Sequence, residues 1–340
     1  MNPLAAMKKA GVLLGAVFLM VLTVEAAEKP FLIKMATLAP EGSAWMKTFE
    51  ALNSEVMAQT ANRVRLKIYA GGVLGDESDM LRKMHIGQIQ AAAFTSSSLA
   101  AFFSEMDVFQ IPFLFQTYEE TDYVLQKMDA FFRQGFADHG YVLLGWTEGG
   151  FVHLMSTIPV ASLSDLKKAK VWTWEDAPMA KAIFDEAQVS AIPLSVPDVL
   201  VGLQTGLVDV VYAPPTGAIS LQWFTRVKYM VDVPLAYLLG GVVLKKDMYA
   251  QMPPAFQEVL DASFAKHMEQ LKLAVRNENQ EATRVMQKHG VQILTPSGEQ
   301  VAEFKRLSDR AMQRLSGHSF SQKVRQEVAD HLETYRGMKK

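Results

Sequence analysis

The sequence contains no cysteine. This absence excludes disulfides, thiolate metal sites, cysteine nucleophiles and lipid attachment at a cysteine. Charge of one sign is not in excess either, because 34 lysines and arginines oppose 36 aspartates and glutamates. Nothing in this balance indicates nucleic-acid binding.

Long apolar runs are also scarce. The longest extends from Ala10 to Val24, and its roughly fifteen residues are fewer than the roughly twenty that span a bilayer. Lys8 and Lys9 precede this run, and Val24-Glu25-Ala26 supplies small residues at a cleavage site. This pattern predicts a secretory signal peptide over residues 1–26. An exported protein without disulfides fits a bacterial periplasm.

The sequence lacks the usual catalytic and cofactor motifs. Its seven histidines include no pair at i and i+4 with a glutamate between them, so a helix-borne zinc protease site is absent. Ser96-Ser97-Ser98 lacks the flanking glycines of a nucleophile elbow. The glycines at 71, 72 and 75 do not have the spacing of a dinucleotide or phosphate loop. We therefore predict a protein that is not an enzyme and has neither a metal nor a cofactor.

Carboxylates cluster at the start of one predicted helix, where Asp76, Glu77 and Asp79 lie close together. The positive end of the helix dipole favours acidic residues in a first turn, which is a sufficient structural reason for them. A ligand-facing role for one of these side chains stays open.

Strand and helix periodicities alternate from Phe31 onward, which predicts an α/β fold with a mostly parallel sheet. Residues 27–340 are enough for two lobes, because single cores stop growing at about 250–300 residues. Paired glycines at 149–150 and 240–241 permit unusual backbone torsions, so we place the crossings between lobes there. The predicted division is lobe I at 27–149 and 241–290, and lobe II at 150–240.

One predicted helix is unusually long. Residues 255–289 contain no proline or glycine, and such a helix would extend roughly 50 Å at 1.5 Å per residue. We expect it to span both lobes. Residues 291–340 are predicted to form C-terminal helices that pack across the lobes.

Four motifs follow one another along the chain: Gly72-Val73-Leu74-Gly75-Asp76-Glu77, Ile111-Pro112-Phe113-Leu114-Phe115, Asp165-Leu166-Lys167-Lys168-Ala169-Lys170-Val171 and Leu203-Gln204-Thr205-Gly206-Leu207-Val208-Asp209. In this order they resemble the extracytoplasmic solute receptors of TRAP transporters, of the dicarboxylate-receptor type. The resemblance implies a two-lobed periplasmic binding protein of the Venus-flytrap kind, with hinge strands and closure over one ligand. It also implies delivery of that ligand to a small and a large membrane subunit.

The chain departs from this family where the family holds the carboxylate of its ligand. Trp172 stands where the resemblance implies an arginine that grips the carboxylate, and Val152 stands where a second arginine is common. Ala213 replaces a usual asparagine, and the aromatic residue expected near Ser195 is absent. A buried carboxylate without a cationic partner costs several kcal/mol. We therefore predict an atypical branch whose ligand is largely apolar or aromatic.

Several alternatives remain open at this point. A conventional organic acid could be bound by another cation, such as Arg82, Lys181 or Arg226. An enzyme with this fold and a periplasmic scaffold that binds protein are rivals from other classes. We expect a monomer, with a helical-repeat periplasmic subunit as a possible additional partner. The predicted ligand-binding residues are Trp172, Trp174, Glu175, Val152, Ala213, Tyr212, Ser195, Ser96, Phe115, Glu77, Trp146 and Trp223.

Overall fold

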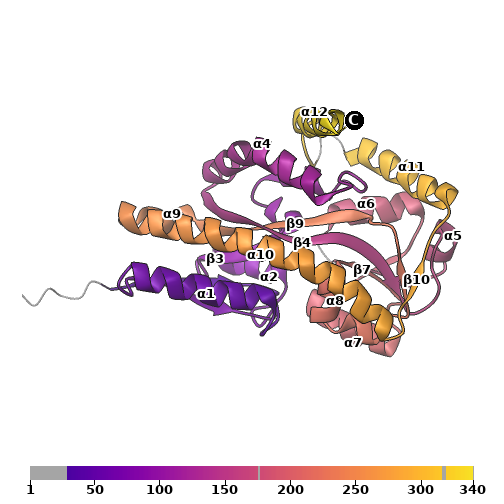
Figure 1. Cartoon of the computed structure of the whole chain (residues 1–340), viewed down its shortest axis with the longest axis horizontal. Helices are drawn as coiled ribbons and strands as arrows, with labels where there is room; N and C mark the ends of the chain where they lie inside the picture. Colours follow the sequence, from indigo (N-terminus) through magenta and orange to yellow (C-terminus); the bar gives the residue numbers. More distant parts are fainter. Residues whose placement is uncertain (1–28, 175–176, 316–318, 340) are drawn as a thin grey trace, which may run out of the picture.

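A computed structural model describes residues 29–174, 177–315 and 319–339. The predicted signal peptide, residues 1–26, lies outside the described residues. Strands and helices alternate along the described chain, as the periodicities predict (Figure 1). The strands are β1 (Phe31–Ala36), β2 (Val64–Tyr69), β3 (Ala91–Thr95), β4 (Tyr141–Ser156), β5 (Val171–Thr173), β6 (Ala191–Pro193), β7 (Val210–Ala213), β8 (Tyr229–Val231), β9 (Ala236–Lys245) and β10 (Gln292–Leu294).

Helices cover both faces of the sheet. They are α1 (Ala44–Gln59), α2 (Glu77–His85), α3 (Ser96–Leu99), α4 (Tyr118–Asp138), α5 (Leu163–Leu166), α6 (Pro178–Ala187), α7 (Val199–Thr205), α8 (Pro215–Ser220), α9 (Lys246–Ala250), α10 (Pro254–Lys288), α11 (Gly298–Leu315) and α12 (Gln322–Met338), with short 3₁₀ turns η1 (Ser104–Gln110), η2 (Val196–Asp198) and η3 (Trp223–Thr225).

The sheet has the strand order β2-β1-β3-β9-β4-β7-β5-β6, while β8 also pairs with β4 and β10 pairs with β8. We call the half built on β2, β1, β3 and β9 lobe I, and the half built on β7, β5, β6, β8 and β10 lobe II. Strands β1, β2 and β3 are parallel, as are β5, β6 and β7, while β9 and β4 run antiparallel to their neighbours. Each lobe therefore has a parallel α/β core.

Strand β4 belongs to both lobes. Its first part pairs with β9 from Tyr141 to Val152, and its last part pairs with β7 from His153 to Ser156. The register shifts between Glu148 and Gly150, where Gly150 has a φ of +96°. A side chain at Gly150 would lie 2.5 Å from the Asn279 amide nitrogen of α10, so both torsion and space require glycine here.

The other glycine pair lies inside the sheet of lobe I. Gly240 and Gly241 belong to β9 and pair with β3 on one side and with β4 on the other. A Cβ atom at Gly240 would lie 2.4 Å from the carbonyl oxygen of Phe94. Close packing between strands is the physical reason for glycine at this position.

Helix α10 crosses the molecule from end to end (Figure 1). Pro254 occupies its first turn, where a missing N–H costs nothing, and no later residue of the helix is proline or glycine. It packs on α1 of lobe I, on β4, and on α8 of lobe II. The long helix that spans both lobes is thus present, within one residue of its predicted bounds.

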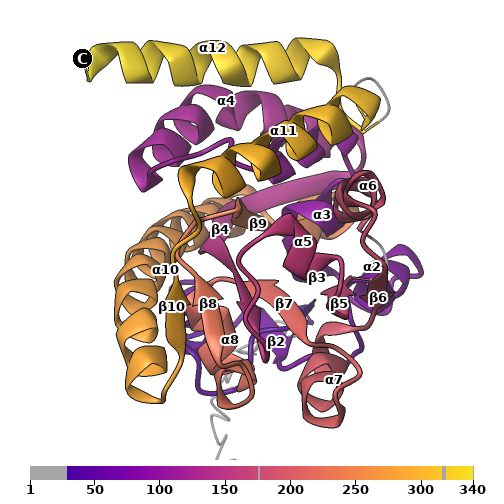
Figure 2. The ribbon, with the colours of Figure 1, turned by 90° about the vertical axis from the view of Figure 1, so that its right-hand side faces the viewer.

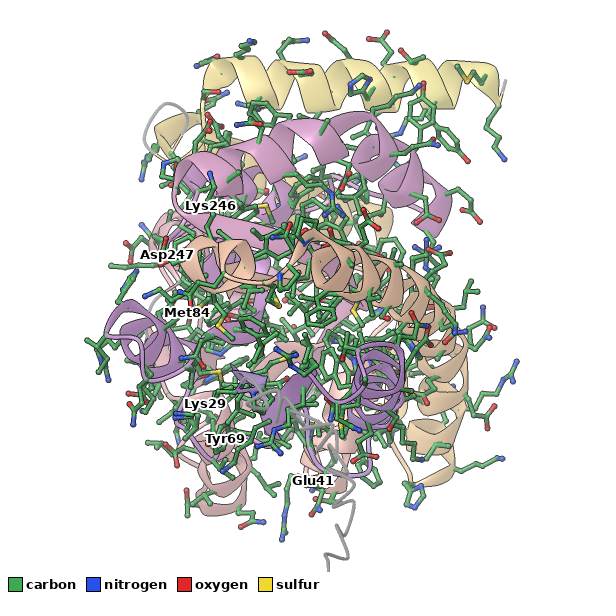
Figure 3. All side chains as sticks on the ribbon, turned by 90° about the vertical axis from the view of Figure 1, so that its left-hand side faces the viewer. Lys29, Glu41, Tyr69, Met84, Lys246 and Asp247 are labelled. Atoms are coloured by element: carbon green, nitrogen blue, oxygen red, sulfur yellow. The ribbon has the colours of Figure 1, made fainter. Side chains whose placement is uncertain are left out.

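The two C-terminal helices cover different parts of the molecule. Helix α12 lies over α4, whereas α11 packs against α6 and α5 of lobe II (Figure 2). Figure 3 shows Lys246 and Asp247 at the start of α9, below α4, and Lys29 and Tyr69 on the β1–β2 side of lobe I. Within the described residues, no helix has the length and apolar character needed to cross a membrane.

Candidate ligand-binding cavity

A cavity of about 370 Å³ lies between the lobes. Lobe I contributes residues at the ends of β1 and β3 and the first residues of α2 and α3, including Thr37, Glu77 and Thr95. Lobe II contributes β5, β7, α6 and α8, including Phe184. The carboxyl ends of parallel strands from both lobes thus meet at one site, which is the usual place for a ligand in α/β folds.

Lobe II presents a cluster of four aromatic side chains, which we call the aromatic wall: Trp172, Trp174, Tyr212 and Trp223. The Trp172 ring centroid lies 5.1 Å from Trp174, 5.0 Å from Tyr212 and 5.3 Å from Trp223. Trp172 and Trp223 are almost fully buried, whereas Trp174 and Tyr212 keep part of their surface exposed. Trp174 and Tyr212 therefore offer the more accessible surfaces to a ligand, and the buried Trp172 packs against both of them.

Two hydrogen bonds fix this wall. The Trp172 indole nitrogen donates to the carbonyl oxygen of Leu194 at 3.0 Å, which satisfies its buried N–H. Burial raises the pKa of Tyr212 to about 12, so its hydroxyl stays protonated, and it lies 3.5 Å from the Thr173 hydroxyl. The wall is apolar and carries no charge at neutral pH.

Lobe I contributes a buried carboxyl group, that of Glu77. One oxygen accepts from the Thr95 backbone N–H at 2.9 Å and the other from the Thr95 hydroxyl at 2.7 Å. Burial raises the pKa of Glu77 to about 7, although hydrogen bonds from Ser98 and Thr95 act in the opposite direction. Near neutral pH both the neutral and the charged form of this carboxyl group are therefore populated.

Two buried polar groups in the lining have no partner. The Ser97 hydroxyl and the Trp174 indole nitrogen are both buried without a hydrogen bond. A buried unpaired donor costs free energy, and a ligand can supply the missing acceptor. Residues 29–174, 177–315 and 319–339 place no lysine, arginine or histidine in the lining.

The cavity brings together most of the residues expected from the sequence. Glu77 and Ser96 lie on its lobe I side, while the others lie on β4 or in lobe II. The expected residues that line the cavity are Trp172, Trp174, Val152, Ala213, Tyr212, Ser96, Glu77 and Trp223. Glu175 lies outside the described residues.

Three expected residues lie elsewhere. Trp146 packs on Phe109 and donates its indole N–H to Asp129, because β4 turns Trp146 and Thr147 to opposite faces. Thr147 lines the cavity in its place. The other two also have local partners: Phe115 stacks on Phe109 in the core of lobe I, and the Ser195 hydroxyl donates to Asp198 at 2.6 Å.

Sequence reasoning missed the residues that α6 and α11 contribute. Met179, Ile183 and Phe184 of α6 line the cavity, as do Phe304 and Leu307 of α11. Their apolar spacing indicates a buried helix face, but it gives no indication that the face borders a cavity.

A hydrogen bond joins the lobes at the edge of the cavity. The Val196 backbone N–H in lobe II donates to the Asp76 carboxylate in lobe I at 3.0 Å. The same side chain caps α2 by accepting from the Glu77 N–H at 2.8 Å. Asp76 thus links the start of the helix that carries Glu77 to the lobe that carries the aromatic wall.

Comparison with protein families identifies this two-lobed arrangement. The model of the bacterial extracellular solute-binding proteins, family 7, matches residues 35–318. The chain belongs to this family. Its members are solute-binding receptors and not enzymes, so the resemblance described above is confirmed at the level of the family.

Relatives of the chain come from several bacteria. The chain is 25% identical over 245 residues to the 2,3-diketo-L-gulonate-binding periplasmic protein YiaO of Escherichia coli, covering 72% of this chain and 74% of that protein. It is 24% identical over 324 residues to the C4-dicarboxylate-binding periplasmic protein DctP of Rhodobacter capsulatus, covering 86% and 93%.

A solved structure confirms the predicted fold class. The sugar acid binding protein DctPAm of Advenella mimigardefordensis, in complex with galactonate, has a TM-score of 0.84 to this chain. The two are 18% identical, and the match covers 90% of this chain and 99% of that one. The fold is thus that of a two-lobed α/β binding protein.

Proposed function

We propose that the protein is the periplasmic receptor of a TRAP transporter and that its ligand is largely apolar or aromatic. The observation that carries this proposal is the lining of the interlobe cavity. An aromatic wall faces a site without any described cation, and the volume of about 370 Å³ is in the range typical of small-molecule pockets. Such a site gains most of its binding free energy from buried apolar surface.

A conventional organic acid is the main alternative, because the named relatives bind acids or are named for them. The cations considered for that role do not line the cavity. Arg82 pairs with Asp79 and Lys181 pairs with Asp185 at the surface, while Arg226 is exposed at the end of η3. A carboxylate in this cavity would be desolvated without a cation among the described residues, which disfavours it.

The proposed partners are the small and large membrane subunits of the transporter, and a helical-repeat periplasmic subunit remains a possible additional one. A signal peptide at residues 1–26 would direct the chain to the periplasm. The concave cavity between the lobes supports a small-molecule ligand over a protein-binding scaffold, because a protein partner would need an extended surface.

Native mass spectrometry of freshly purified protein tests the ligand class. We expect the intact protein to retain a compound that denaturing extraction identifies as largely apolar or aromatic. Trp174→Leu should retain less of it, because the exposed face of Trp174 borders the cavity. Trp146→Leu is the matched control, since Trp146 packs away from the cavity. Recovery of a sugar acid or a small dicarboxylate would contradict the proposal.

We further propose that the lobes close over the ligand by bending at β4 near Gly149 and Gly150. The Asp76–Val196 hydrogen bond would form on closure, because its two partners lie on different lobes. Helix α10 fixes the bending point, since the Asn279 amide donates to the Gly149 carbonyl at 2.7 Å and its oxygen accepts from Thr216 in α8.

Asp76→Ala is expected to weaken ligand binding by about 1–3 kcal/mol, because the closed state loses a charge-assisted hydrogen bond. Small-angle scattering with saturating ligand should show a larger radius of gyration for this variant than for the wild type. Ser321→Ala is the control, because Ser321 caps α12 far from the cavity. Equal affinities and equal radii for Asp76→Ala and the wild type would argue against closure through this contact.

A further inference from the structure

The cavity has charge of only one sign in its described lining. Glu77 and Glu278 are the carboxylates there, and no described cation opposes them. Glu278 is exposed on α10, so solvent screens it. Glu77 is only 7% exposed, so solvent screens a charge on its carboxyl group much less than it screens Glu278.

The neighbours of Glu77 stabilise a charge without neutralising it. Thr95 of β3 and Ser98 of α3 donate hydrogen bonds to its oxygens. The adjacent Asp76 adds repulsion, which also raises the pKa of Glu77. Ionised Glu77 is thus solvated by dipoles but lacks a counter-ion, and a buried charge in this state gains strongly from a cationic partner.

The aromatic wall suits the same kind of ligand. Trp174 and Tyr212 are half-buried in the lining, and the faces of such rings attract organic cations while burying apolar surface. Trp172 packs against both rings, and its indole N–H donates a hydrogen bond to the Leu194 carbonyl. Two residues further along the chain, the Val196 backbone N–H donates to the carboxylate of Asp76, the residue that precedes Glu77. A short path of contacts therefore connects the wall with the carboxyl group across the cavity.

We propose that the cavity takes an organic cation, with its apolar body against Trp174 and Tyr212 and its ammonium group at the Glu77 carboxylate. This inference rests on the proposed function and specifies the ligand class within it. A ligand with an anionic group would meet repulsion from Glu77 and find no described cation. A neutral apolar ligand would leave an ionised Glu77 without a cationic partner and would favour the neutral form of this carboxyl group.

A matched set of probes with one apolar body tests the inference: phenylbutylamine, phenylbutanol and phenylbutyrate, titrated by calorimetry. At about pH 8 the amine should bind at least about tenfold more tightly than the alcohol, and the acid more weakly than either. The preference for the amine should shrink between about pH 8 and about pH 6, because protonation of Glu77 removes its charge while the amine stays charged. Binding of the alcohol should change little over this range.

Glu77→Gln removes the charge and should reduce the ratio of amine to alcohol affinity to about one. Asp198→Asn is the control, because Asp198 is an exposed carboxylate of η2 outside the lining, and it should keep the ratio within about threefold. The pH series on the wild type gives the same information should Glu77→Gln fold poorly.

Three results would overturn the inference. If the three probes bind with equal affinity, or if the acid binds most tightly, the charge on Glu77 does not select the ligand. Binding of the alcohol without preference for the amine also overturns it, but leaves the apolar-ligand proposal standing. Failure of all three probes to bind would contradict both proposals.

Discussion

Replacing Trp172 with alanine is expected to lower the free energy of unfolding by about 3–5 kcal/mol. The side chain is fully buried, contacts Trp174, Tyr212 and Trp223, and donates to the Leu194 carbonyl. Its removal leaves a cavity in the core of lobe II and an unpaired carbonyl oxygen. Urea denaturation monitored by circular dichroism measures the change.

The same variant should also weaken ligand binding, by about 1–4 kcal/mol, because Trp174 and Tyr212 lose the ring that holds their faces toward the cavity. Trp146→Ala is a matched control. It also removes a packed indole and one hydrogen bond, but in lobe I away from the cavity. Both variants should lose stability, and only Trp172→Ala should lose affinity for the compound recovered from the native protein. Equal affinity in both variants would contradict a binding role for the aromatic wall.

The sequence predicts the elements of this fold well where local rules decide them. Helix α10 lies within one residue of its predicted bounds because uninterrupted helix-forming residues run from Pro254 to a glycine at 290. Strand β4 is different. The pair Gly149-Gly150 reads as a break, yet the strand continues through it with a shifted register, because Asn279 of α10 bonds to the bulged backbone. That support comes from 130 residues away and leaves no local signal.

The candidate site shows the same limit. Trp172 and Trp146 are both tryptophans on strands, and only the phase of each strand decides which one reaches the cavity. Trp172 directly follows a motif of the receptor family, and this position predicts that it borders the cavity. Trp146 follows no such motif. The unpaired Ser97 hydroxyl and Trp174 indole nitrogen could not be predicted, because hydrogen bonding depends on neighbours that the fold brings together.

Arg276→Met is expected to destabilise the protein by about 3–5 kcal/mol, because it leaves a buried carboxylate unpaired. The Arg276 guanidinium bonds to Glu148 at 2.7 and 2.9 Å and to both oxygens of Asp122 at 2.7 Å. Glu148 is 3% exposed and directly precedes the bulge of β4. Tyr237 of β9 also donates to this carboxylate. The network therefore joins α10, α4 and both long strands at the point where the lobes meet.

A double variant separates the charge from the packing. Glu148→Gln combined with Arg276→Met removes the unpaired charge and should recover part of the lost stability, since neutral replacements of buried ion pairs are often tolerated. Arg284→Met is the control on the same helix: its pair with Glu281 is exposed, so the change should stay within about 0.5 kcal/mol. Urea denaturation of the four proteins measures these differences. If Arg276→Met costs no more than Arg284→Met, the buried network does not stabilise the region where the lobes meet.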